Sequence, residues 1–446
     1  MTASQIDSFD SAGVAGAGLP DAPERADETL RDAGIDPDRL SIAYLGEPVP
    51  AARAVPVPWA ARLAVGLVLS TLLYLLKHFE FEIPSWAYAS FALIIGLILL
   101  QSACSALVTA SERLAARLEW DHYVAGTVAE ILSTLPELIV IGFLIPVSPL
   151  TALVIALITI YNNALVFSIY SFFLPKDQQG KFLMPGPITG AGTQILVAGA
   201  AIGLILGLVM MAMSFSEHPK KSIAPVDLFT IGTLMLGIFA VYLYTLLQDY
   251  AKEEGLVSDT LELTGEQIET RRALIYVRVH ESPWLLICGY LIVGIIGATL
   301  GGELVAQFAQ IAIQDLQLNH MVTALALAGF AGMSEYVILW QSHRKGEYGI
   351  ALANSFGGIT QVMFMVLPFT LIAIGCYQAW INPNHPELPL LISFTNMLLL
   401  LFLFPMLFVL VELLEEDHTL GLLDTTVMIG IFLLLIIVLL SYGARI

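Results

Sequence analysis

The sequence has 446 residues, of which 57% are hydrophobic and only 13% are charged. That charged fraction is about half of what an ordinary soluble domain carries, which excludes a soluble enzyme. The net charge of −19 disfavours nucleic acid as a partner, because phosphate binding needs Lys and Arg. Several apolar runs reach the roughly 20 residues that cross a bilayer as a helix. The sequence therefore predicts an all-α polytopic membrane protein that has the lipid bilayer as its surroundings.

The first 57 residues are polar, with 10 acidic and 4 basic residues and few large apolar side chains. Such a segment cannot bury a core, so we predict that the acidic tail 1–57 is disordered. It lacks the apolar stretch of a cleavable signal. The three cysteines of the chain all lie in apolar runs, which shows neither a disulfide framework nor a zinc-ligand spacing. No cofactor is expected.

Eleven transmembrane helices follow the tail, each bounded by Pro, Gly or a charge cluster. A leading helix at 58–78 precedes two halves, 87–248 and 283–443, each with five spans. An acidic loop at 249–282, with eight acidic and four basic residues, separates the halves. Because five is odd, two homologous halves would insert in opposite orientations. The spans cover approximately 59–77, 87–110, 123–145, 148–174, 188–213, 226–248, 284–311, 320–341, 348–376, 389–413 and 421–442.

The basic residues set the orientation. Fourteen Lys and Arg residues fall on the side of the tail and the acidic loop, and four fall on the other side. The positive-inside rule therefore places the N-terminus in the cytoplasm and the C-terminus outside it. We expect an integral multi-pass protein of a bacterial plasma membrane, and a homo-oligomer is compatible with these patterns.

Charged residues deep inside a span are costly, and by default they mark a function. Four acidic residues meet this description: Glu130, Glu137, Glu303 and Glu335. Two of them belong to a repeat, because 26 residues separate Glu137 from Asn163 and 26 also separate Glu335 from Gln361. Each acid lies in the second span of its half, and each amide lies in the third. Matching polar residues in two inverted halves predict a binding site at the membrane midplane.

The donor atoms of this repeat point to one class of ligand. The two carboxylates, the amides of Asn162, Asn163 and Gln361, and the hydroxyl of Thr159 are all hard oxygen donors. Ca²⁺ binds about 6 to 8 such oxygens. The sequence therefore predicts a calcium site, with the metal as a transported ion.

Helix breaks could supply further oxygens. Pro136 has no N–H to donate to the carbonyl of Leu132, which is then free to face a cavity. Gly332 would loosen the partner helix in the same way.

The charges suggest how transport is coupled. Two ionised carboxylates balance one divalent cation, or two protons can neutralise them instead. Burial and mutual repulsion favour the protonated forms in an empty site, and metal binding displaces those protons. The sequence therefore predicts a secondary active transporter, not an enzyme, which exchanges Ca²⁺ for H⁺ by alternating access. A Na⁺(K⁺)/H⁺ antiporter or a Na⁺/Ca²⁺ antiporter of the same fold is the alternative.

Three further acids are candidates for a proton path or for gating. Glu130 lies two helical turns before Glu137 on the same face, where it could line an ion path or pack against a neighbouring polar group. Glu112 and Glu303 fall at corresponding places in the two halves. They could gate the site or admit protons, or they could simply lie near an interface.

The repeat residues resemble the calcium:cation antiporter superfamily, which carries paired, inverted alpha-repeats. The stretch Ser133-Thr-Leu-Pro-Glu-Leu-Ile-Val is similar to the first repeat of the sodium/calcium exchangers. The stretch Ala351-Leu-Ala-Asn-Ser-Phe-Gly-Gly-Ile-Thr-Gln-Val-Met-Phe is more similar to the second repeat of the calcium/proton exchangers. The likeness covers spans two to eleven, and the extra leading span is also as in the proton exchangers.

The resemblance implies roles for individual residues. Glu137 and Glu335 would be the central ion-binding carboxylates. Asn163, with Asn162 beside it, and Gln361 would be amide ligands on the helices that follow. Gln361 stands where the sodium/calcium exchangers carry an extra acid, which favours coupling to protons over coupling to sodium.

Overall fold

The structure is a computed structural model. It describes residues 59–118, 122–176, 180–184, 188–215, 223–260, 283–318, 320–332, 335–336, 339–340, 343, 348–381, 393–416 and 418–443. Two of the predicted segments therefore lie outside the described residues, namely the acidic tail 1–57 and most of the acidic loop, 261–282.

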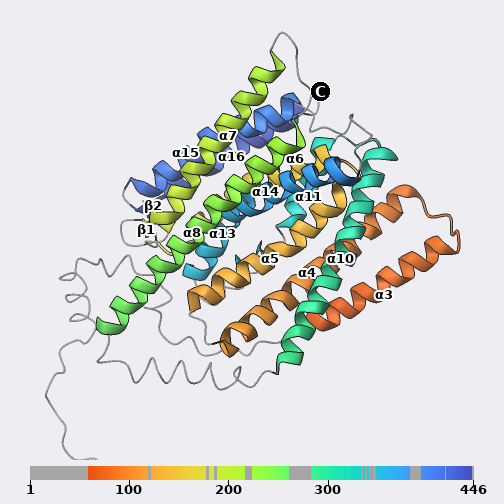
Figure 1. The fold of residues 1–446 in the computed structure, drawn as a ribbon, viewed down its shortest axis with the longest axis horizontal. Coiled ribbons are helices and arrows are strands. Elements are labelled where there is room, and N and C mark those ends of the chain that lie inside the picture. The colour runs from red at the N-terminus through yellow and green to blue at the C-terminus, as the bar shows by residue number, and fades with distance from the viewer. Residues whose placement is uncertain are drawn as a thin grey trace, which may run out of the picture.

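Long helices joined by short connections make up the described part of the chain (Figure 1). Eight of the helices in this part are long and apolar enough to cross a membrane, and two shorter apolar helices accompany them. The predicted all-α polytopic fold is thereby confirmed. The helices up to the acidic loop are α3 (Trp59–His78), α4 (Ser85–Arg117), α5 (His122–Leu144), α6 (Pro149–Phe172), α7 (Thr193–Ser214) and α8 (Pro225–Thr260).

After the acidic loop, one continuous helical stretch, 348–381, contains two π-helical turns. The first turn, Val362–Val366, directly follows Gln361, and the second is Tyr377–Ile381. Residues 335–336, 339–340 and 343, beyond the end of α11, are also helical. The helices are α10 (Trp284–Gln314), α11 (His320–Ala331), α13 (Tyr348–Gln361), α14 (Leu367–Cys376), α15 (Phe394–Glu415) and α16 (Leu422–Gly443).

Several helix boundaries differ from the sequence prediction, and α4, for example, runs to Arg117 instead of 110. Helix α8 continues to Thr260 instead of ending at 248, so the first residues of the acidic loop are helical. The added residues include the run Ala251-Lys-Glu-Glu254, which consists of good helix formers. Helix α15 begins at Phe394 instead of 389, because the hydroxyl of Ser393 accepts a hydrogen bond from the backbone N–H of Asn396 at 3.1 Å and caps the helix.

A short β-ribbon that the sequence did not predict joins two distant loops. Strand β1 (Phe182–Leu183) pairs antiparallel with β2 (Thr419–Leu420), with Phe182 opposite Leu420. The ribbon connects the segment after α6 to the segment between α15 and α16. Strands of two residues are too short to show the alternating pattern by which strands are recognised in a sequence.

Helices α4 and α10, which are the first helices of the two predicted halves, pack closely along each other. They approach at Gly96 and Gly301: a Cβ on Gly96 would stand 3.0 Å from the carbonyl oxygen of Gly301, and one on Gly301 would stand 2.9 Å from that of Gly96. Glycine at both positions lets the two backbones meet. Helix α3 lies against this pair and leaves most of its surface exposed (Figure 1).

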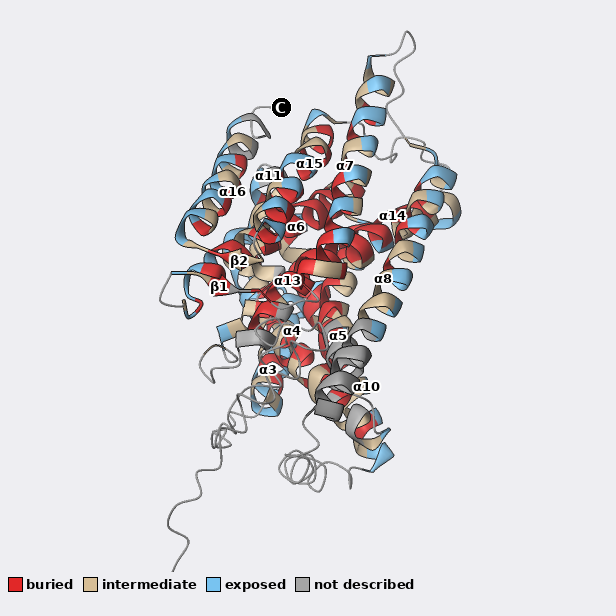
Figure 2. Cartoon of the chain, turned by 90° about the vertical axis from the view of Figure 1, so that its left-hand side faces the viewer, coloured by how far each residue is buried: buried red, intermediate tan, exposed pale blue. Residues whose placement is uncertain are grey.

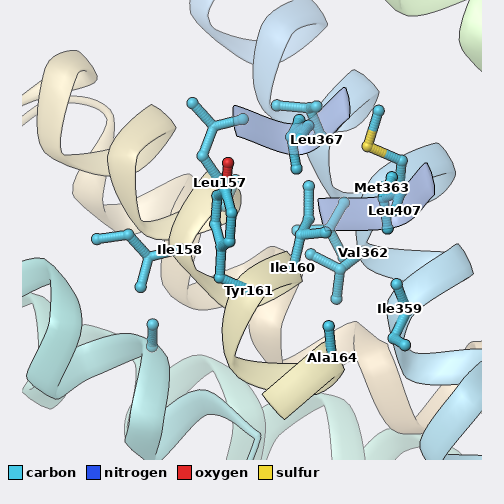
Figure 3. Packing of buried hydrophobic residues seen from close by; sticks show 14 of the residues in the cluster. Leu157, Ile158, Ile160, Tyr161, Ala164, Ile359, Val362, Met363, Leu367 and Leu407 are labelled. Carbon is cyan, nitrogen blue, oxygen red and sulfur yellow. The ribbon is translucent and has the colours of Figure 1, made fainter. Parts of the chain in front are cut away.

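Helix α6 forms the centre of the molecule. Most of its residues are buried, while few residues of α3 and α8 are buried (Figure 2). It packs against α11, α13 and α16. Figure 3 shows the apolar contacts at this centre, where Leu157 and Tyr161 of α6 lie near Val362 and Leu367 of the helix that follows α13. The central helices therefore have few lipid-facing positions, and polar residues on them are buried in protein.

Candidate functional site

Helix α5 places one carboxylate in the interior of the protein. Glu137 is only 5% exposed, and neither of its carboxylate oxygens has a hydrogen-bond partner among the described residues. The helix continues through Pro136, which has no N–H for the carbonyl of Leu132. A buried ionised carboxylate without a partner is costly. Glu137 therefore needs either a proton or a cation.

Two amides are buried in the same incomplete way on the central helices. Asn163 of α6 is 1% exposed, and Gln361 at the end of α13 is 3% exposed. Among the described residues, neither amide atom of Asn163 and not the Oε1 atom of Gln361 has a hydrogen-bond partner. Buried polar side chains are nearly always hydrogen-bonded in folded proteins, so an unpaired set of this kind calls for a ligand or an ordered water.

The carboxylate of Glu335, in the second half of the chain, lies near the amide of Asn163, in the first half, beside Gly358. Glu335 is 7% exposed. A Cβ on Gly358 of α13 would lie 2.7 Å from the Oε2 atom of Glu335 and 2.9 Å from the Nδ2 atom of Asn163. The backbone carbonyl of Glu335 also accepts a hydrogen bond from Asn354 of α13 at 3.3 Å. Three helical segments that are far apart in the sequence thus converge at one point.

The remaining predicted ligands take different positions. Thr159 is buried, and its hydroxyl donates to the carbonyl of Ile155 one turn earlier at 2.8 Å. Its oxygen keeps a free lone pair with which to accept or to bind a cation. Asn162 is half-buried and donates its amide to the hydroxyl of Tyr336. Of the adjacent amides, Asn163 therefore belongs to the convergence point and Asn162 to a helix-to-helix contact.

Tyr336 is a residue of the site that sequence reasoning missed. Its hydroxyl accepts the hydrogen bond from Asn162 and lies within electrostatic range of both Glu335 and Glu137. The signal that could have found it is its position directly after an intramembrane acid. A tyrosine in a span carries no charge and is ordinary there, so its residue type alone did not mark it.

The predicted break at Gly332 does not take the expected form. Helix α11 ends at Ala331, but the N–H of Gly332 still donates to the carbonyl of Ala328 at 3.4 Å. The carbonyl of Gly332 in turn accepts from the N–H of Tyr336 at 3.1 Å. Helical hydrogen bonding thus passes through the glycine, and the space left by its missing side chain accommodates the Tyr336 ring.

The structure does not bring the outlying acids to this point. Glu303 is exposed on α10, where it accepts a hydrogen bond from Gln307 at 3.3 Å. Gln307 in turn accepts one from the hydroxyl of Tyr88 on α4 at 2.7 Å. Glu303 therefore lies on the exposed side of α10 and not at the convergence point, and its role in gating or proton entry stays a prediction. The side chains of Glu112 and Glu130 lie outside the described residues.

An aromatic pair lies on one side of the convergence point. Phe167 is one helical turn beyond Asn163 on α6, and Phe356 is two residues before Gly358 on α13. Both are buried, and their rings meet edge-on with centroids 5.8 Å apart. Further along, the rings of Tyr170 and His343 meet edge-on at 5.7 Å.

The site offers oxygen donors and little else. Among the described residues, no group of three or more His, Cys, Asp or Glu side chains could hold a metal ion. The carboxylate of Glu335 and the amide of Asn163 converge near Gly358, and Glu137 is close enough to Tyr336 for its charge to act on the phenol. Such donors suit hard cations such as Ca²⁺, Mg²⁺ or Na⁺ and do not suit soft metals.

Comparison with known proteins finds a family model that matches the second half of the chain. Residues 284–441 match the family model described as sodium/calcium exchanger protein. No curated protein matches the sequence. The matched range begins at α10 and includes Glu335 and Gln361.

Solved structures show the same fold over most of the chain. The crystal structure of the H⁺/Ca²⁺ exchanger CAX has a TM-score of 0.56 at 15% identity, covering 86% of this chain and 88% of that chain. Native YfkE has a TM-score of 0.55 at 13% identity, covering 85% and 98%. A selenium-substituted form, described as the Ca²⁺/H⁺ antiporter protein YfkE, gives 0.56 at 12% identity with the same coverage. The expected resemblance is thereby confirmed over 284–441 by the family model, and the solved structures show the same fold over most of the chain.

Proposed function

We propose that this protein is a calcium/proton antiporter of a bacterial plasma membrane. Its transport unit consists of two inverted five-helix halves, 87–248 and 283–443, and the leading helix 58–78 stands outside that unit. The N-terminus and the acidic loop face the cytoplasm, and the C-terminus faces the outside. The match to the sodium/calcium exchanger family supports the transport of Ca²⁺.

One observation carries the proposal: the carboxylate of Glu137 is buried inside a membrane-spanning protein without a hydrogen-bond partner among the described residues. An acid in that position is stable only when a proton neutralises it or a cation balances it. The unpaired amides of Asn163 and Gln361 supply oxygens for the second case. Glu335 adds the second carboxylate that a divalent cation requires.

The coupling follows from charge balance. One Ca²⁺ neutralises the two ionised carboxylates of Glu137 and Glu335, and two protons neutralise them equally well. If the site must be neutral when the protein changes between its two access states, it holds either one Ca²⁺ or two protons during that change. Each Ca²⁺ moved in one direction is then exchanged for protons moved in the other.

The aromatic pair gives the site one closed side. Phe167 and Phe356 pack across the space between α6 and α13, next to the residues that meet at Gly358. Alternating access requires that one side of a binding site be closed while the other is open. We propose that this pair forms the barrier at the end where α6 finishes and α13 begins, which the charge distribution places toward the cytoplasm.

Ion flux in inverted membrane vesicles tests the function. With an imposed proton gradient, we expect ⁴⁵Ca²⁺ uptake by the intact protein and none by Glu137→Gln or Glu335→Gln. Glu412→Gln is a matched control, because Glu412 is exposed on α15. Full ⁴⁵Ca²⁺ uptake by either site variant, with protein amounts in the membrane equal, would overturn the assignment of the carboxylates.

The same vesicles distinguish the coupling ion. Recovery of a quenched pH-sensitive dye on adding Ca²⁺, and not on adding Na⁺ or K⁺, is the result expected of a calcium/proton antiporter. Recovery on adding Na⁺ alone would replace the proposal with a monovalent cation antiporter of the same fold.

A further inference from the structure

A tyrosine connects the two halves of the molecule beside the proposed cation site. The hydroxyl of Tyr336 accepts a hydrogen bond from the side-chain amide of Asn162 on α6. Asn162 belongs to the first half of the chain, and Tyr336 belongs to the second. Adjacent residues thus form two of the contacts between the described parts of these segments: Glu335 meets Asn163 near Gly358, and Tyr336 meets Asn162.

The backbone around Tyr336 is shaped to hold the ring in this place. A Cβ on Gly332, one turn earlier, would lie 2.7 Å from the Tyr336 hydroxyl oxygen and 2.9 Å from the ring carbon that bears it. A side chain at position 332 would therefore displace the hydroxyl. Gly329, three residues earlier, has nothing within 4 Å of its Cβ position, so of these two glycines only Gly332 is closely packed.

The charges of Glu335 and Glu137 both act on the Tyr336 hydroxyl. It lies within electrostatic range of Glu335 and of Glu137, which come from different halves. Because it accepts from Asn162, its own proton is available for a further acceptor. A phenol placed in this way can respond to whether the carboxylates hold protons or a cation.

We propose that Tyr336 is a positioning residue of the cation site, and that it acts by holding Asn162. The proposal rests on the proposed antiport function. Asn162 and Asn163 share a peptide group, as do Glu335 and Tyr336. The hydrogen bond between Asn162 and Tyr336 therefore limits the rotation of α6. It thereby sets the orientation of the neighbouring Asn163 side chain relative to Glu335.

Loss of the hydroxyl is expected to weaken cation binding without stopping transport. In vesicles, Tyr336→Phe should raise the half-saturating Ca²⁺ concentration about fivefold, which is the effect of losing one buried hydrogen bond, and should leave the maximal rate nearly unchanged. Tyr161→Phe is the matched control. Tyr161 is a fully buried tyrosine that directly precedes Asn162 on α6. Its hydroxyl donates instead to the backbone carbonyl of Leu399 on α15.

A double-mutant cycle separates this role from a merely structural one. If Tyr336 acts through Asn162, then Asn162→Ala should raise the half-saturating concentration as much as Tyr336→Phe, and the double variant should raise it no further. Multiplying effects in the double variant, or an unchanged half-saturating concentration in Tyr336→Phe, would overturn the proposal.

A second variant reaches the same contact without removing the hydroxyl. Gly332→Ala should reproduce the rise in half-saturating concentration, and Gly329→Ala should not. Thermal melting of the purified variants shows which of them are folded. If the intact protein transports Na⁺ and not Ca²⁺, the proposed function fails, and the same cycle is then measured with Na⁺ to decide the role of Tyr336 separately.

Discussion

The carboxylate of Glu335 and the amide of Asn163 meet over Gly358, each within 3 Å of the point where a Cβ of that glycine would stand. Glu335 and Asn163 come from opposite halves of the chain, and the glycine that separates them belongs to the helix that also carries Gln361. The bare Cα of Gly358 thus leaves the room in which a cation or protons would be held.

A methyl group at Gly358 should therefore block the site. We expect Gly358→Ala to reduce Ca²⁺ exchange to background, because the new Cβ would stand 2.7 Å from the Glu335 carboxylate. Alanine is a better helix former than glycine by roughly 0.5–1 kcal/mol, so helix stability should not fall on that account. The measurement is ⁴⁵Ca²⁺ uptake with the melting temperature determined in parallel. Gly142→Ala is the control, since nothing lies within 4 Å of its Cβ position. Normal exchange by Gly358→Ala would show that the ion does not bind here.

Calcium binding should depend steeply on pH. If both Glu137 and Glu335 lose protons when Ca²⁺ binds, the dissociation constant should rise by up to about a hundredfold for each pH unit of acidification below their titration range. The sign follows from competition, because protons occupy the same carboxylates. Isothermal titration at several pH values measures both the affinity and the protons released. A dissociation constant that is independent of pH would contradict the shared-site mechanism.

Removing the Phe167 ring from the Phe167–Phe356 pair should make the proposed cation site accessible from the side that this pair covers. In a protein with Cys104, Cys288 and Cys376 replaced by serine, a cysteine at buried Ala164 should resist a charged thiol reagent. We expect Phe167→Ala to expose it, because the Phe167–Phe356 contact covers this side of the site.

The control for that experiment is another buried phenylalanine. Phe432→Ala on α16 removes a side chain of the same size that is 2% exposed and is not part of the Phe167–Phe356 contact. Equal labelling of the Ala164 cysteine in both variants would indicate general loosening of the protein and would contradict a local barrier.

The helices could be predicted from the sequence because each is a long apolar run with polar ends. All eleven predicted spans coincide with helical segments of the described part, with differences of a few residues at most ends. The β-ribbon at Phe182 and Leu420 escaped prediction, because it depends on two loops meeting and not on any local pattern. The positions of the tail and of most of the acidic loop stay predictions.

The acids of the site could be predicted in part. Glu137 and Glu335 stood out because an ionisable residue within a span is costly wherever it faces. Glu303 stood out for the same reason, yet it lies on the exposed side of α10. Hydropathy along the chain measures how deep a residue lies in its span, and it does not report which side of the helix faces protein and which faces lipid.

By itself, the sequence determined that the chain crosses the membrane many times, that each half carries an acid and an amide 26 residues apart, and that these are oxygen donors. Only the tertiary structure decided which neighbours meet. Adjacent residues on a helix point about 100° apart. The packing of α6 against two other helical segments therefore places Asn163 near Glu335 and Asn162 against Tyr336. The spacing of these residues along the sequence does not predict this pairing.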